Sequence, residues 1–383
     1  MTDFLQLHLL TTYPPSNPNR DDLGRPKTAI IGGRMRQRIS SQAIKRAVRT
    51  SDAFVAALVG HKGERTQRLG EVVLDHLVGK GLGMEKARAI ARGIAEAFGK
   101  IEEFPSEGGK KSKQPDDEAQ VDTKGKQKQK EKAEKAYIKQ LAFISPDEKR
   151  LALELADKAV AGAPLPKEKD LAKTLLRAAD GAVDIAMFGR MLADNPDFNR
   201  EAAVQVAHAF TTNAVEIEDD YYTAVDDLKK PTEDAGAGFV GEAGFSAGVY
   251  YLYVCVNRDL LVKNVDGDRT LAARGLGALV SALATASPTG KRNSFANHVR
   301  AEFMLGEKGD AQPRSLASAF TMPIEAGDQL ETSIARLMTK RAAFTEAYGK
   351  DWREELALHV GAPGSASLAD VVAFAAAGLG ETP

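Results

Sequence analysis

Positive charge is concentrated in residues 32–49, which contain no acidic residue. The cations there are Arg34, Arg36, Arg38, Lys45, Arg46 and Arg49. The whole chain has a formal net charge of only -1, so this accumulation is local. Like charges held together repel one another and raise the free energy of the folded state, and a bound anion relieves that repulsion. The stretch therefore predicts a binding site for an anionic partner.

The spacing of the first cations predicts an extended strand. Arg34, Arg36 and Arg38 recur at every second residue, and side chains with that spacing lie on one side of a strand. Ser40 and Ser41 follow them, and serine is among the residues preferred as a helix cap. We therefore expect a strand that ends just before a capped helix.

Helical spacing begins at Gln42. Polar side chains recur at i, i+3, i+4 and i+7 on one side of this helix and are Gln42, Lys45, Arg46 and Arg49. Ala43, Ile44, Ala47 and Val48 fill the opposite side. The helix N-terminus adds unpaired backbone N–H groups and the positive end of the helix dipole, and both favour a phosphate.

A solvated basic face, neutralised by acids of neighbouring elements, is the alternative interpretation of these cations. Two successive elements that each align their cations to one side favour a nucleic-acid strand instead. If all six cations contacted phosphates of one single strand, the logarithm of the binding constant would fall with the logarithm of salt concentration at a slope of about -4. Such an electrostatic contribution would dominate binding.

Composition limits the class of protein. The chain has 383 residues, 43% of them apolar and 27% charged, which is typical of a globular protein. The near-neutral balance argues against a protein that coats nucleic acid indiscriminately. The single cysteine, Cys255, lies in an apolar run and excludes an internal disulfide framework. No segment resembles an export signal or a membrane span, so we expect a cytoplasmic protein with no membrane partner.

The N-terminal half predicts a strand, a loop and a long helical segment. Residues 4–10 nearly alternate and predict a strand, whereas the Pro- and Asn-rich residues 11–26 predict a loop, with Arg20 in it and Lys27 at its end. Residues from about 55 to 205 are rich in Ala, Leu and Glu at helical spacing. Residues 105–137 within them are rich in Lys and Gln and nearly lack apolar side chains, so we expect a flexible loop there.

The C-terminal half predicts alternating strands and helices. A helix is expected around His208, a strand over 248–257, a helix over 269–286, a strand over 298–307 and a helix over 333–349. Without the insertions, the order strand, helix, strand, helix, strand fits an α+β domain of ferredoxin-like or RNA-recognition-motif type. Residues 215–247, rich in acids, prolines and glycines, form a long excursion between strands.

Two further motifs have competing interpretations. Asp21 and Asp22 could hold a metal ion in a ribonuclease, although adjacent aspartates in an Asn- and Pro-rich loop are more often turn formers. Tyr221 and Tyr222, followed by Thr223, could anchor their segment to a core or stack against bases. The GAGFVG run at 236–241 matches a dinucleotide fingerprint but is not placed between a strand and a helix, so we expect no cofactor. The histidines show no metal-ligand spacing, so we expect no metal.

Five ordered motifs together resemble the CasC family, the backbone subunit of the type I-E CRISPR surveillance complex Cascade. They are NRDD at 19–22, GGRMRQRISSQAIKRAVR at 32–49, VDIAMFGRM at 183–191, AHAFTT at 207–212 and YTAVDDL at 222–228. The resemblance implies an RNA-recognition-type palm over 1–55, 206–214 and 249–383. It also implies a helical fingers insertion over 56–205 and a β-hairpin thumb over 215–248.

The same resemblance implies a function. Several copies would assemble head to tail on the CRISPR RNA, together with the other Cascade subunits, and each thumb would displace a base while the remaining bases pair with target DNA. The subunit would not be catalytic, because a separate helicase-nuclease cuts the DNA in this family. The resemblance assigns phosphate contacts to Ser40, Gln42, Lys45 and Arg49, with Arg20 and Lys27 nearby. It places Met191, Tyr222 and Thr223 around the displaced base. Arg190, which precedes Met191 in the GRM motif, is a further candidate for RNA binding.

Three functions therefore compete at this stage. The first is a non-catalytic RNA-binding filament subunit, the second a metal-dependent ribonuclease that uses Asp21 and Asp22, and the third a duplex-binding structural protein. Residues 105–137 match no motif of the family, and they could contact target DNA or remain disordered.

Overall fold

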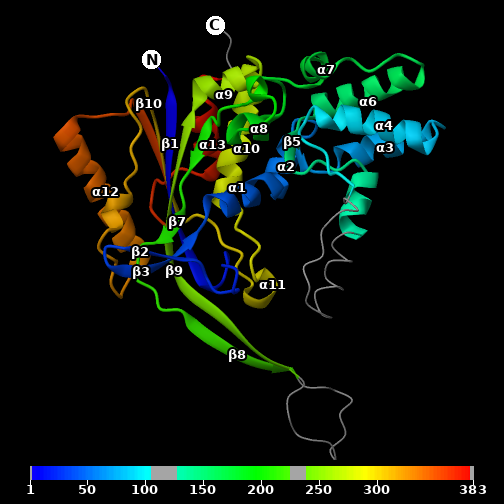
Figure 1. Cartoon of the computed structure of the whole chain (residues 1–383). Helices are drawn as coiled ribbons and strands as arrows, with labels where there is room; N and C mark the ends of the chain where they lie inside the picture. Colours follow the sequence, from blue (N-terminus) through cyan, green and yellow to red (C-terminus); the bar gives the residue numbers. More distant parts are fainter. Residues whose placement is uncertain (1, 105–126, 225–238, 380–383) are drawn as a thin grey trace, which may run out of the picture. The chain divides into compact units, whose positions relative to one another are not determined.

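The computed structural model describes residues 2–104, 127–224 and 239–379 (Figure 1). They form two compact units. Unit 1 comprises residues 1–58, 204–261 and 269–383, and unit 2 comprises residues 59–203 and 262–268. The insertion expected from the sequence covers 56–205, and the sequence did not indicate that 262–268 joins the second unit.

Unit 1 is built around one antiparallel sheet. Its strand order is β11-β10-β1-β9-β7-β3-β2. The strands are β1 (Phe4–Ser16), β2 (Thr28–Ile31), β3 (Arg34–Ile39), β7 (Ala209–Thr211), β9 (Phe239–Asn257), β10 (Phe303–Gly309) and β11 (Glu354–His359). Two more strands, β6 (Val204–Val206) and β8 (Glu218–Ala224), also pair with β9. The predicted α+β class is thereby confirmed.

Helices cover both faces of this sheet (Figure 1). They are α1 (Ser41–Thr50), α2 (Asp52–Ala57), α10 (Arg269–Thr285), α11 (Arg292–Phe295), α12 (Gln329–Tyr348) and α13 (Leu368–Ala376), with a 3-10 turn over Ala317–Phe320. Helix α9 (Arg258–Asn264) continues directly from β9.

Alternation along the central strands explains why two layers of helices are needed. Leu9 and Tyr250 face one side, where they line a small cavity with Ile44 of α1. Leu10 and Tyr251 face the other side and join a buried cluster that includes residues of α12. Because successive strand residues point to opposite faces, the continuous buried run at 5–10 requires cover on both.

Two expectations for unit 1 are wrong. Strand β1 continues through residues 11–16, which were expected to be a loop, because Pro14 and Pro15 lie at a shift in register where the pairing jumps from Tyr13 to Ser16. The helix expected around His208 is replaced by the short strands β6 and β7. Their backbone groups pair with the long strand β9, and that pairing overrides local helix preference.

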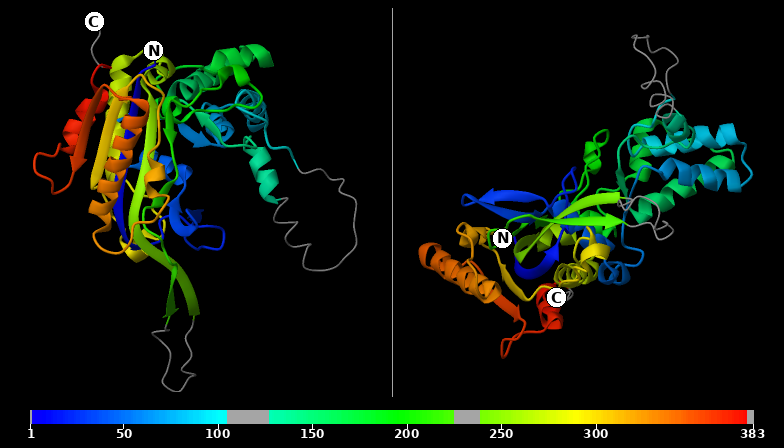
Figure 2. Two further views of the ribbon diagram at one scale, coloured as in Figure 1. Left: turned by 90° about the vertical axis from the view of Figure 1, so that its left-hand side faces the viewer. Right: turned by 90° about the horizontal axis from the view of Figure 1, so that it is seen from below.

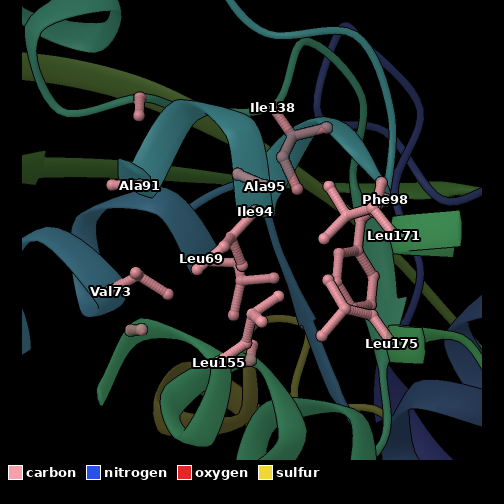
Figure 3. Packing of buried hydrophobic residues seen from close by; sticks show 14 of the residues in the cluster. Leu69, Val73, Ala91, Ile94, Ala95, Phe98, Ile138, Leu155, Leu171 and Leu175 are labelled. Carbon is pink, nitrogen blue, oxygen red and sulfur yellow. The ribbon is translucent and has the colours of Figure 1, made fainter. Parts of the chain in front are cut away.

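Unit 2 consists mainly of helices around its own apolar core (Figure 3). Its elements are β4 (Glu64–Thr66), α3 (Leu69–Gly79), α4 (Met84–Glu96), β5 (Ala142–Ile144), α6 (Pro146–Val160), α7 (Glu168–Leu175), α8 (Val183–Phe188) and a 3-10 turn over Pro196–Phe198. Leu69, Ile94 and Leu155 come from three of these helices and meet in the core (Figure 3).

The structure describes only part of the Lys- and Gln-rich segment that was expected to be a flexible loop. Residues 105–126 lie outside the described residues, whereas 127–134 are helical. Ala133, Ala136 and Tyr137 at its C-terminal end are buried, and Ile138 belongs to the core of unit 2. The prediction of a flexible loop is therefore wrong for residues 127–137, because periodic alanines and one tyrosine supply the packing contacts.

Among the described residues, no helix combines the length and the apolar character needed to cross a lipid bilayer. Within those same residues, no cluster of three or more His, Cys, Asp and Glu side chains could hold a metal ion.

Candidate nucleic-acid interface

Ser40 caps helix α1. Its Oγ accepts a hydrogen bond from the backbone N–H of Ala43 at 3.3 Å. Its own backbone N–H donates to Asn19 Oδ1 at 2.8 Å. The cap expected at Ser40 is confirmed, whereas Ser41 is already the first residue of the helix. The start of α1 is thus held both by its own cap and by the preceding loop.

Helix α1 has the two faces that its sequence predicts. Ile44 and Val48 are buried, Gln42 and Arg46 are exposed, and Lys45 and Arg49 are partly buried. The helix contains no acidic residue. Burial lowers the pKa of the Lys45 ammonium, because a low-dielectric surrounding disfavours the charged form. A bound phosphate would oppose that effect.

The loop before β2 is tied to the start of α1. Asn19 accepts from the backbone N–H of Lys27 at 2.9 Å, and Lys27 accepts from that of Arg38 at 2.8 Å. Arg20 is exposed and forms an isolated backbone bridge with Pro26. These backbone bonds fix the loop that carries Arg20 and Lys27. The same loop contacts Ser40 through Asn19. Asn19 is a positioning residue that sequence reasoning missed, although its place in an Asn-Pro-Asn run is a turn signal.

The three arginines of β3 do not share an accessible face. Arg34 is exposed and Arg38 is partly buried, but Arg36 is completely buried. The Arg36 guanidinium donates to the backbone carbonyls of Thr211, Thr212, Phe320 and Thr321 at 2.8 to 3.4 Å. This geometry does not support the prediction that Arg36 binds RNA, because the side chain is buried and its Nη1 and Nη2 groups already donate to backbone oxygens.

Arg38 contacts Thr28 and His208. Its Nε donates to Thr28 O at 3.0 Å, and its Nη1 lies 2.9 Å from His208 Nδ1. Burial, together with the charges of Arg38 and Lys27, lowers the pKa of His208 below its ordinary 6.5. At neutral pH the imidazole is uncharged and can accept from Arg38, so the two groups do not repel each other.

Asp21 has the structural role of a turn former. Its Oδ1 accepts from the backbone N–H groups of Leu23 at 3.0 Å and Arg25 at 2.9 Å. Asp22 is exposed. These bonds are those of an aspartate that stabilises a loop, which is the turn-former interpretation of this pair.

The hairpin of β8 and β9 extends away from the sheet (Figure 2). Tyr221, Tyr222 and Thr223 lie on β8, all of whose residues are exposed. The ring of Tyr222 packs against that of Phe239 with 6.1 Å between their centroids. Gly241 leaves room for this ring, since a Cβ there would lie 2.6 Å from Tyr222 Cζ. Exposed aromatic surface of this kind could contact the flat faces of bases.

Polar contacts with the loop before β2 and with Asn17 hold this hairpin in place. Arg25 Nη2 lies 3.1 Å from Asp219 Oδ1, and Asn17 Nδ2 donates to Gly244 O at 2.9 Å. The loop that positions Arg20 is thus also the loop that supports the hairpin. The glycine-rich run at 236–241 leads into strand β9 rather than into a helix, and its residues 236–238 lie outside the described residues.

Unit 2 contributes two predicted residues with different surroundings. Met191 is 81% exposed and lines a hollow of about 160 Å³ that also includes Lys139 and Leu141. Arg190 is buried, and its Nη1 donates to Glu148 Oε2 at 2.6 Å while its Nη2 donates to Arg177 O at 2.8 Å. This geometry does not support the prediction that Arg190 binds RNA, because the side chain is buried and its Nη1 and Nη2 groups already donate to partners inside unit 2.

The sequence matches the protein family described as CT1975-like protein over residues 5–376. A search of curated proteins gave no match. Among solved structures, the chain is similar to a component of a "CRISPR RNA-guided surveillance complex, pre-nicking", with 29% identity and a TM-score of 0.79. That alignment covers 98% of this chain and 99% of the other. A second component, of a "CRISPR RNA-guided surveillance complex", has 26% identity and a TM-score of 0.66, with 96% and 94% covered.

Proposed function

The chain belongs to the CT1975-like protein family, and from this membership we propose that it is a subunit of a CRISPR RNA-guided surveillance complex, where it binds the guide RNA without cutting it. The similarity to components of such complexes extends over nearly the whole chain. The finer assignment to the CasC backbone subunit of a type I-E complex is part of the proposal and rests on the five sequence motifs.

The observation that carries the proposal is the surface formed by α1 and the loop before β2. It joins the capped helix N-terminus with Gln42, Lys45, Arg46 and Arg49, and adds Arg20 and Lys27 from the loop and Arg34 and Arg38 from β3. Charged and amide groups of this kind bind phosphates and carry no base preference. The guide sequence is then read by base pairing and not by this protein, as in another RNA-guided effector.

Unit 1 supports an RNA-recognition-type palm. Its elements follow the order β1, α1, β7, β9, α10, β10, and the corresponding strands lie side by side as β10-β1-β9-β7. This is the arrangement of the ferredoxin-like class, to which RNA-recognition modules belong. Unit 2 corresponds to the fingers of this proposal, and the hairpin of β8 and β9 to the thumb.

The hairpin would displace a base from the RNA of a neighbouring copy. Tyr221, Tyr222 and Thr223 are exposed on it, and Met191 is exposed on unit 2. In a head-to-tail assembly, the hairpin of one copy and the Met191 of another can meet at each repeat. Such a heterologous contact does not close on itself and generates a helical filament along the guide.

Binding by α1 is tested with the Lys45→Glu/Arg49→Glu variant. We expect it to lose guide RNA during purification at moderate salt, because two attractive phosphate contacts become repulsive. The matched control is Arg274→Glu/Lys340→Glu, which reverses two charges on α10 and α12. Unaltered retention of RNA by the first variant would contradict the proposal, and so would retention lost equally in both.

Base displacement by the hairpin is tested with Tyr222→Ala. We expect weaker binding of single-stranded RNA by about 1 to 3 kcal/mol, because one stacked ring is removed. The salt dependence should stay the same, since no charge changes. Tyr222→Phe keeps the ring and serves as the control. If both variants bind like the unmodified protein, Tyr222 does not stack on a base.

A further inference from the structure

A second group of cations lies in residues 286–300, which connect α10 with β10. Together with α1 and α2, this segment surrounds a hollow of about 390 Å³. Arg292, His298 and Arg300 line it along with several serine and threonine hydroxyls. Among the described residues that line the hollow, the acidic one is Asp52. The lining is therefore rich in donors and suited to an anion.

The hollow lies next to the cationic face of α1. Ala47 and Thr50 of α1 are part of its lining. Thr50 follows Arg46 by four residues, so the two lie on the same side of the helix. The Thr50 hydroxyl donates to Arg46 O at 2.8 Å. An extended anion bound along the cationic side of α1 can therefore continue into the hollow while it stays in contact with the protein.

The same segment contacts the loop that carries Arg20. Gly290 lies so close to it that a Cβ would be 2.3 Å from Pro18 O and 2.9 Å from Asn17 O. Only glycine fits this approach without a shift of backbone. Lys291 comes directly after it, and the described residues provide no hydrogen bond or ion pair to its ammonium group.

The backbone of this segment adopts an unusual conformation. Lys291 and Ala296, at the two ends of α11, both have φ of 48°, a region that non-glycine residues seldom enter. Phe295 packs against Phe245 at 5.7 Å between ring centroids, and Arg292 Nη2 donates to Ser287 O at 2.5 Å. Such a conformation persists only where the surroundings determine it, and it is often found at binding sites.

We propose that residues 289–300 are a second phosphate-binding element for the same single-stranded RNA, with Lys291 and Arg300 as cations that contact it. This inference rests on the proposed function and extends its surface beyond the elements that the sequence motifs indicate. Arg292 holds the segment in shape through Ser287, while Arg300 is exposed. The RNA would then lie between α1 with its preceding loop on one side and this segment on the other.

The test compares salt dependence of RNA binding by the full-length protein, with poly(U) as the probe. The Lys291→Asn/Arg300→Gln variant removes two charges, and asparagine suits the left-handed backbone at 291. We expect the salt slope to become shallower by about 1.4, so that between about 50 and 200 mM salt the variant loses roughly sevenfold less affinity than the unmodified protein does. The control Arg274→Gln/Lys340→Gln should keep the original slope, and thermal unfolding should verify that all variants are folded.

The outcomes separate this inference from the proposed function. If Lys45→Gln/Arg49→Gln makes the slope shallower and Lys291→Asn/Arg300→Gln does not, the second element is overturned and the function stands. If the slope changes only for duplex DNA, the element binds another partner and the inference is equally overturned. If the unmodified protein binds poly(U) with no salt dependence, both proposals fail together.

Discussion

Arginines on α1 and arginines in unit 2 have opposite surroundings. On α1, Arg46 is exposed and the helix has no acid. In unit 2, Arg190 and Arg200 are 6% and 4% exposed, and each forms an ion pair, with Glu148 at 2.6 Å and with Asp180 at 2.7 Å. The residue type alone does not decide whether an arginine stabilises the fold or binds a ligand.

The hydrogen-bond acceptors around an arginine side chain determine whether it stabilises the fold or binds a ligand. A buried guanidinium needs partners for its five N–H donors, and carboxylates or backbone carbonyls must provide them. Arg36 shows that the rule acts within one strand, because it is buried among carbonyls while Arg34, two residues earlier, is exposed. An arginine surrounded by acceptors is structural, and one without them remains available to phosphate.

The largest expected effect comes from the buried pair of unit 2. Arg190→Met should lower the free energy of unfolding by about 3 to 5 kcal/mol, because Glu148 is left as a buried charge. Denaturant unfolding measures this loss. Adding Glu148→Gln should restore part of it, and a double variant less stable than Arg190→Met alone would show that Glu148 acts independently of Arg190.

Arg36 should give the next largest effect. Arg36→Met leaves several buried carbonyls without donors and should lower the free energy of unfolding by about 1 to 3 kcal/mol. Arg34→Met is the matched control, and we expect a change within about 0.5 kcal/mol because that side chain is exposed. Equal effects in the two variants would contradict the distinction between buried and accessible arginines on β3.

The second ion pair of unit 2 predicts a pH dependence. Burial alone would raise the pKa of Asp180, but hydrogen bonding and the charge of Arg200 outweigh it, so the pKa lies below its ordinary 3.8. The carboxylate therefore stabilises the fold fully above pH 3.8, and this contribution is lost as the pH falls through the lower pKa of the folded state. Asp180→Asn should be less stable than the unmodified protein at neutral pH, and the difference should shrink in acid. A difference independent of pH would mean that ionisation of Asp180 does not matter.

The smallest effect on stability is expected at α1. Arg46→Gln should change the free energy of unfolding by less than about 0.5 kcal/mol, because an exposed side chain is altered. The same variant should make the salt slope of RNA binding shallower by about 0.7, the contribution of one phosphate contact to a single strand. A large loss of stability with an unchanged slope would place Arg46 with the structural arginines.

Local patterns predicted the parts of the site that depend on nearby residues. The capped helix over Ser41–Thr50 and its two faces follow from the spacing of Gln42, Lys45, Arg46 and Arg49. The burial of Arg36 and Arg190 could not be predicted in this way. Their acceptors come from positions far along the chain, such as Phe320 and Glu148, and the sequence does not show which distant carbonyl will face a given side chain.

Prediction of the fold is limited in the same way, because local patterns do not show which distant segments pair. The class and the long strand over 248–257 were predicted, because alternation and β-branched residues are local signals. The short strands β6 and β7 were missed, since three residues carry too little periodicity and their pairing with β9 is a tertiary effect. The continuation of β1 to Ser16 was missed for a related reason, because two prolines normally end a strand unless a register shift accommodates them.

The length of strand β9 determines how far the hairpin extends from the sheet. It runs without interruption from Phe239 in the hairpin to Asn257, which pairs with Phe4 in the sheet. A strand advances about 3.3 Å per residue and alternates its side chains. Inserting one residue between the two parts would lengthen the arm by that amount and turn Phe239 to the opposite face. In the head-to-tail assembly that we propose, the number of residues in this one strand would set how far the hairpin of each copy reaches along the RNA.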